Sequence, residues 1–250
     1  MLSSSGDASR HAPLSATLSQ IFRGKLCDVV LGGRPTSTVD KDEAIYDIGD
    51  EDHTLYFLRS GFAKIGTITE DGHELIYDVR KTGDVLGELC VSEGPRQDRA
   101  VALEKCNFIA VPFDDLLAVV QRDRALLRQL MQVFCDSLSD AYDQLSSVAF
   151  GGTVERLVKV LHKLGMELGR DSPQGLEIAT YLTQEELAQM VAARRERVSL
   201  AMNFLRDRGL VRYSRRGYLV LNREGIANYD GAAPSRVADA AISVARVLPR

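Results

Sequence analysis

The feature that most constrains this chain is an apolar series with alternating spacings of four and three. Its members are Leu127, Met131, Phe134, Leu138, Ala141, Leu145 and Val148. This spacing holds apolar side chains on one stripe of an α-helix, and such a seam is typical of a helix that pairs with a copy of itself. We expect a homodimerisation helix within 115–152. Gly151-Gly152 would end this helix and form a hinge. Packing of this helix on its own domain is the alternative.

The chain before this helix follows a different period. Short apolar runs occupy 44–48, 55–58, 63–68 and 75–77, and turn residues such as Asp71-Gly72 separate them. Strands spaced about 8–12 residues apart with turns between them are typical of a small barrel or sandwich. Residues 1–20, which are rich in Ser and Ala, are expected to form a mobile arm.

Composition excludes several classes of protein. Of the 250 residues, 45% are hydrophobic and 26% are charged, as in globular proteins. No apolar run approaches the roughly 18 residues of a membrane span, and residues 1–20 lack an apolar stretch flanked by basic residues, so we do not expect a secretory signal there. The four cysteines lie far apart, which indicates a reduced, cytoplasmic protein without a zinc finger. We expect no metal and no covalently bound cofactor.

Charge is distributed unevenly along the chain. Residues 38–93 hold 14 acidic and 5 basic side chains, whereas 194–216 hold 8 Arg and 2 acidic side chains. The net charge of −4 excludes a wholly basic nucleic-acid coat but leaves room for a local basic surface.

The basic segment has the pattern of a helix-turn-helix. Thr183 and Glu186 form a capping box, the helix that follows ends near Val191, and Ala192-Ala193 form a tight turn. The inward face of a second helix carries Val198, Ala201, Met202 and Leu205. Its first turn carries Arg194, Arg195, Glu196 and Arg197. Cations at the positive end of a helix dipole favour a negative partner, so we expect binding to double-stranded DNA. Two strands around Arg215 and Arg216 would form a wing.

Taken together, these motifs resemble the Crp/Fnr family of bacterial transcription regulators, of the catabolite activator protein type, over about residues 21–222. The segments that carry the resemblance are 61–64, 71–75, 82–89, Ala102-Leu103, 149–157 and the helix-turn-helix. The resemblance implies an α+β fold with four parts. These are an N-terminal β-roll, like the jelly roll of cyclic-nucleotide-binding domains (21–114), the dimerisation helix and hinge (115–152), a winged helix-turn-helix (153–225) and a tail (226–250).

The resemblance also implies a ligand site. Gly87-Glu88-Leu89 would close over a cyclic nucleotide, and Arg96, counted back from Ala102, would pair with its phosphate, with Arg99 as a second candidate. The site residues are Gly87, Glu88, Leu89, Arg96, Gln97, Asp98, Arg99 and Tyr142. Gln97 and Asp98 depart from the family's hydroxyl and alanine, and the helix positions for adenine are Ala141 and Tyr142. Three possibilities stay open: cyclic AMP (cAMP) or cyclic GMP (cGMP), a larger anion such as cyclic di-GMP, or a pocket without ligand in which Glu88 and the arginines form a structural ion pair.

For DNA, the resemblance assigns base reading to Arg195 and Glu196, on an inverted-repeat site. Leu200 replaces a third family contact, an Arg. The remaining DNA-binding residues are Thr183, Gln184, Arg194, Arg197, Arg215 and Arg216. A loop over 170–174 corresponds to the family's surface for RNA polymerase. Since no P-loop, HExxH or nucleophile–base motif is present, we do not expect an enzyme. A cyclic-nucleotide module that regulates a partner protein is an alternative. The basic helix-turn-helix favours DNA binding over this alternative.

Overall fold

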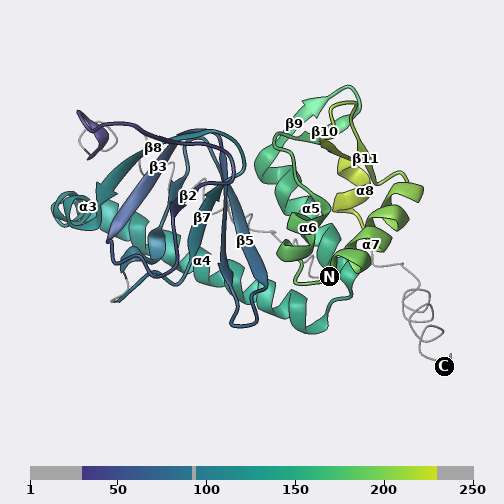
Figure 1. The fold of residues 1–250 in the computed structure, drawn as a ribbon, viewed down its shortest axis with the longest axis horizontal. Coiled ribbons are helices and arrows are strands. Elements are labelled where there is room, and N and C mark those ends of the chain that lie inside the picture. The colour runs from purple at the N-terminus through teal and green to yellow at the C-terminus, as the bar shows by residue number, and fades with distance from the viewer. Residues whose placement is uncertain (1–29, 92–93, 230–250) are drawn as a thin grey trace, which may run out of the picture. The chain divides into compact units, whose positions relative to one another are not determined.

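A computed structural model describes residues 30–91 and 94–229 of the chain (Figure 1). The chain divides into two compact units, with the boundary between Asp143 and Gln144. The expected arm at 1–20 and most of the expected tail, from residue 230 on, lie outside the described residues. Within the described part, no helix is both long and apolar enough to span a membrane.

The first unit is built from two antiparallel four-stranded sheets. One has the order β1-β8-β3-β6 and the other β2-β7-β4-β5. The strands are β1 (Ser37–Val39), β2 (Ala44–Tyr46), β3 (Thr54–Ser60), β4 (Phe62–Ile68), β5 (Glu74–Lys81), β6 (Val85–Leu86), β7 (Arg99–Ala102) and β8 (Cys106–Pro112). The 3₁₀ helix η1 (Glu88–Val91) follows β6. The expected β-roll is confirmed.

Two apolar clusters stabilise this unit. Leu58, Ile65, Leu86 and Phe108 are all buried in a cluster to which both sheets contribute. A second cluster includes Leu116 of helix α3 (Phe113–Val120), which packs with buried residues of β3 and β8. Strands β2, β3, β4 and β5 overlap the apolar runs at 44–48, 55–58, 63–68 and 75–77, so these short runs between turn residues located them.

Helix α4 (Arg124–Phe150) contains the whole predicted seam and ends before Gly151-Gly152. The described large side chains of the seam are exposed in the single chain: Leu127, Met131, Phe134, Leu138 and Leu145, at 36–66%. A row of exposed large apolar side chains is unusual on a monomeric surface.

The second unit begins with helix α5 (Thr153–Leu168). Helices α6 (Gln184–Met190) and α7 (Arg195–Asp207) form the helix-turn-helix, with Ala192 in the left-handed region at φ 49° in the turn between them. Antiparallel strands β11 (Val211–Tyr213) and β12 (Leu219–Leu221) form the wing, and α8 (Arg223–Ala227) follows. The four side chains expected to face inward from α7 are all buried.

The prediction of a loop at 170–174 is wrong. Strands β9 (Gly169–Ser172) and β10 (Gly175–Ile178) form an antiparallel hairpin there, and β10 also pairs with β12. Strand β9 lies at the edge of the sheet β11-β12-β10-β9 and carries no alternating apolar residues, which hid it from pattern analysis. Gly175, at φ 128°, permits the tight reversal.

The capping box of α6 provides a stability prediction. The Thr183 hydroxyl accepts from the Glu186 amide at 3.1 Å, and the Glu186 carboxylate accepts from the Thr183 amide at 2.7 Å. Thr183→Ala should lower the free energy of unfolding by about 1 kcal/mol, because the Glu186 amide loses its partner. Thr183→Ser is the matched control and should retain wild-type stability in denaturant titrations. Equal losses for both variants would contradict a capping role.

Candidate functional site

Arg96 is one of two buried charged residues of the predicted ligand site, together with Asp98. Its side chain is 2% exposed. The guanidinium donates to both carboxylate oxygens of Asp52, at 2.6 Å from Nη2 and 3.2 Å from Nε, and to the carbonyl of Thr54 at 2.6 Å. Burial raises the pKa of Asp52, but its hydrogen bonds with Arg96 and that positive charge outweigh the effect and hold the pKa below its ordinary value.

Aromatic rings cover the same guanidinium. The Arg96 guanidinium carbon lies 4.1 Å from the ring centroid of Tyr46 and 5.5 Å from that of Tyr56, and the two rings stack. The Tyr46 hydroxyl donates to Asp98 at 2.8 Å. Burial, together with the negative charge of Asp98, raises the pKa of Tyr46, so this hydroxyl stays a hydrogen-bond donor.

Gly87 makes room for Arg96. A Cβ at Gly87 would lie 3.0 Å from Nη1 of Arg96 and 3.0 Å from the Thr54 carbonyl, and Gly87 adopts φ 84°. Both the contact and the backbone conformation favour glycine. Nη1 is buried and has no hydrogen-bond partner, so one donor group of Arg96 is still available beside Gly87. An anionic ligand suits this donor.

Glu88 is engaged by a different arginine from those predicted. Its carboxylate accepts from Arg80 Nη2 at 3.0 Å, and Asp78 lies 3.3 Å from Arg80 Nη1. Burial raises the pKa of Glu88, and the charge of Arg80 opposes that rise. An ion pair of Glu88 was one of the open possibilities, but with Arg96 or Arg99 as its partner.

The other predicted ligand residues are more dispersed. Arg99 pairs with Asp47 at 3.2 Å, and the amide of Gln97 donates to the carbonyl of Pro95 at 3.1 Å. Leu89, on η1, and Tyr142, on α4, are exposed at 53% and 60%. The structure therefore brings Gly87 and Tyr46 against Arg96, and Tyr46 connects Arg96 to Asp98.

Sequence reasoning missed the three partners Asp52, Tyr46 and Arg80. Asp52 belongs to the acidic turn 50–52, where a carboxylate looks like any solvated turn residue. Arg80 lies near the end of a strand, a common place for an exposed base, yet it is 6% exposed. No local pattern in the sequence distinguishes these residues.

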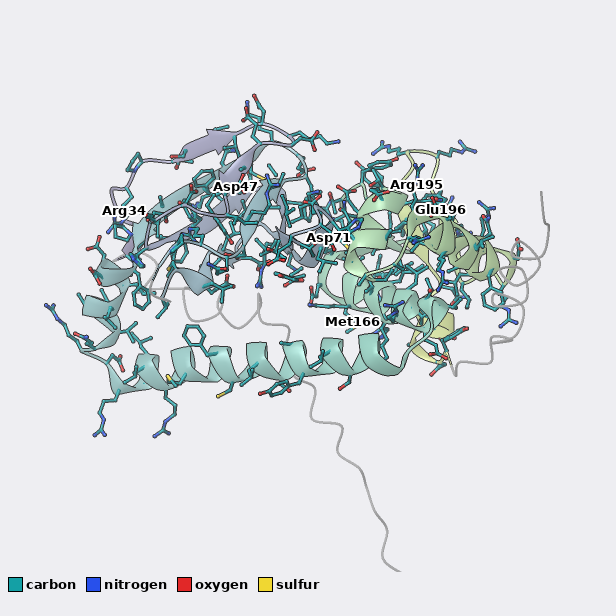
Figure 2. All side chains as sticks on the ribbon, turned by 60° about the horizontal axis from the view of Figure 1, so that its bottom comes forward. Arg34, Asp47, Asp71, Met166, Arg195 and Glu196 are labelled. Atoms are coloured by element: carbon teal, nitrogen blue, oxygen red, sulfur yellow. The ribbon has the colours of Figure 1, made fainter. Side chains whose placement is uncertain are left out.

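The predicted DNA-reading residues share one surface at the start of α7. Arg195 and Glu196 occupy its first turn and are exposed (Figure 2). The flanking Arg194 and Arg197 are exposed as well. Arg194 is the N-cap residue of α7, but its side chain makes no capping hydrogen bond. The positive end of the α7 dipole and these arginines therefore reinforce one another.

The remaining predicted DNA residues lie on α6 and in the wing. Thr183 serves as the cap of α6, and Gln184 begins that helix. The Ser199 hydroxyl of α7 donates to the side-chain oxygen of Gln184, which leaves the amide NH₂ of Gln184 as a donor. Arg215 and Arg216 are exposed in the turn of the wing.

Comparisons with known proteins agree with this architecture. Residues 36–123 match the model of the cyclic nucleotide-binding domain, and residues 155–229 match that of the Crp-like helix-turn-helix domain. The chain is 28% identical over 188 residues to the CRP-like cAMP-activated global transcriptional regulator of Mycobacterium tuberculosis, covering 75% of this chain and 84% of the relative.

Solved structures show the same fold. FixK2 from Bradyrhizobium japonicum superposes with a TM-score of 0.68 at 22% identity, covering 80% of this chain and 98% of FixK2. The c-di-GMP-responsive global regulator CLP of Xanthomonas campestris gives a TM-score of 0.65 at 23% identity, covering 78% of this chain and 97% of CLP.

In this chain, a β-roll that matches the cyclic nucleotide-binding domain precedes a Crp-like winged helix-turn-helix, and its relatives regulate transcription. The protein is therefore a DNA-binding transcription regulator of the Crp/Fnr family.

Proposed function

We propose that this regulator acts as a dimer whose β-roll binds a cyclic nucleotide or cyclic dinucleotide and whose paired α7 helices read an inverted repeat. The observation that carries the proposal is the exposed first turn of α7, where three arginines and Glu196 surround the positive end of the helix. Arg195 would pair bidentately with guanine, and Glu196 would accept from cytosine N4.

The proposed effector is a nucleotide with a phosphodiester. Arg96 Nη1 offers a buried, unpaired donor beside Gly87, and relatives are described as cAMP-activated or c-di-GMP-responsive. We propose cAMP, cGMP and cyclic di-GMP as candidates. Asp98 favours a ligand with N–H donors, since one of its carboxylate oxygens is buried and unpaired.

A second candidate is a regulator that binds DNA without any nucleotide. The pairing of the pocket arginines favours it: Arg96 with Asp52, Arg80 with Glu88, and Arg99 with Asp47. These pairs already supply the charge compensation that a ligand phosphate would bring to the arginines.

In the proposed mechanism, ligand binding shifts the arrangement of the dimer helices or of the hinge at Gly151-Gly152. Two recognition helices must enter successive major grooves, about 34 Å apart, for tight binding. A ligand changes DNA affinity only through its different affinities for the two arrangements. We place the protein in the cytoplasm and propose RNA polymerase as a partner at the β9–β10 hairpin.

If α4 forms the dimer interface, substitutions on its apolar stripe should change the oligomeric state. Phe134 and Leu138 lie on the exposed apolar stripe, so replacing both with Glu should yield monomers, because paired helices would bury like charges. Ser139→Glu, off the stripe, is the control and should remain dimeric in sedimentation velocity. A doubly substituted protein that sediments as a dimer would eliminate α4 as the interface.

Substitutions of base-contacting and of phosphate-contacting arginines should affect DNA binding differently. Arg195→Ala should lose about 1–3 kcal/mol of binding free energy and relax preference at one base pair, because it removes a base contact. Arg215→Ala, in the wing, should weaken all sequences alike and flatten the salt dependence.

Selection on randomised DNA, followed by salt titration, distinguishes the two variants. The wild type should select a two-fold inverted repeat with G and C in each half. At the base pair that faces Leu200, replacement should cost little, since leucine makes no hydrogen bond. Selected sites without dyad symmetry, or unchanged base preference in Arg195→Ala, would refute the assignment.

A further inference from the structure

Within the proposed function, we infer that Asp52 is an internal competitor for the effector's phosphate and thereby sets effector affinity. The inference rests on the assignment of the pocket to a cyclic nucleotide. The carboxylate of Asp52 pairs with Arg96, the arginine that would bind the phosphate of an anionic ligand.

The pairing geometry gives the first reason. A phosphate is held best by two parallel N–H donors of one guanidinium. In Arg96, Nε and Nη2 both donate to Asp52, and Nη2 also donates to the Thr54 carbonyl. Only Nη1 is unpaired, so a phosphate can gain the parallel Nε–Nη2 pair of Arg96 only if Asp52 yields it.

Charge gives the second reason. Arg96 is flanked by two carboxylates, Asp52 directly and Asp98 through Tyr46. A phosphodiester at Nη1 would add a third negative group to one buried guanidinium. Like charges in a poorly solvated site repel strongly, so the carboxylate of Asp52 opposes binding even where it does not block it.

Exposure indicates which partner would move. The side chain of Arg96 is 2% exposed and lies under two tyrosine rings, whereas that of Asp52 is 33% exposed. Asp52 belongs to the turn before β3, where its other contacts are with the Thr54 amide at 3.0 Å and the Tyr56 hydroxyl at 3.4 Å. Asp52 can therefore turn to water while Arg96 stays in place for the phosphate.

The test is calorimetric titration of the full chain with cAMP, cGMP and cyclic di-GMP. Asp52→Asn keeps the shape and one acceptor but removes the charge, and Asp52→Ala removes both. Each should bind at least one of the nucleotides about tenfold or more tightly than the wild type does. Asp50→Asn is the control: its carboxylate, in the same turn, accepts from the Asp47 amide rather than from Arg96, so this variant should bind like the wild type.

The outcomes distinguish failure of the proposed role of Asp52 from failure of the proposed nucleotide effector. A wild type that binds a nucleotide, with folded Asp52 variants that bind it equally or more weakly, overturns the inference alone and makes Asp52 a residue that positions Arg96. If the wild type and both folded Asp52 variants bind none of the nucleotides, the inference and the proposed effector fail together. Thermal melting of each sample establishes that it is folded, and Asp52→Asn decides alone if Asp52→Ala does not fold.

Discussion

A guanidinium closed off from water must find its hydrogen-bond partners inside the protein, and that of Arg96 organises one end of the β-roll. Its side chain binds the turn before β3, and its backbone exchanges hydrogen bonds with Gly49 and Asp50 in the turn after β2. Tyr46 of β2 and Tyr56 of β3 cover it, and Gly87 leaves space for it. One charged side chain thus joins segments from both sheets.

The same constraint determines the electrostatic state of the pocket. The arginines that would attract a phosphate are compensated by carboxylates of the chain itself, and Glu88 is occupied by Arg80. These pairs leave the arginines compensated without a ligand, and removing one partner of a buried pair would leave an uncompensated charge. Under the proposed function, a phosphate that takes the Nε–Nη2 pair of Arg96 would have to exchange with Asp52, whereas Nη1 could donate to it without exchange.

Much of the fold could be predicted because its signals are local. The Thr183–Glu186 capping box, the four-three spacing of α4 and the buried face of α7 each depend on neighbours in sequence. Strand β9 escaped because an exposed edge strand needs no apolar alternation. Asp52 and Arg80 escaped because their roles depend on partners 44 residues away in one case and on burial at a strand end in the other.

If a cyclic nucleotide controls DNA binding by this protein, the affinity of the full chain for DNA should depend on the nucleotide. Measuring that affinity is the most direct test. Fluorescence anisotropy at fixed salt, with a labelled duplex carrying the selected inverted repeat, would compare the protein alone and with saturating cAMP, cGMP or cyclic di-GMP. The account predicts that at least one nucleotide changes the affinity by about fivefold or more. Equal affinities under all four conditions would contradict it.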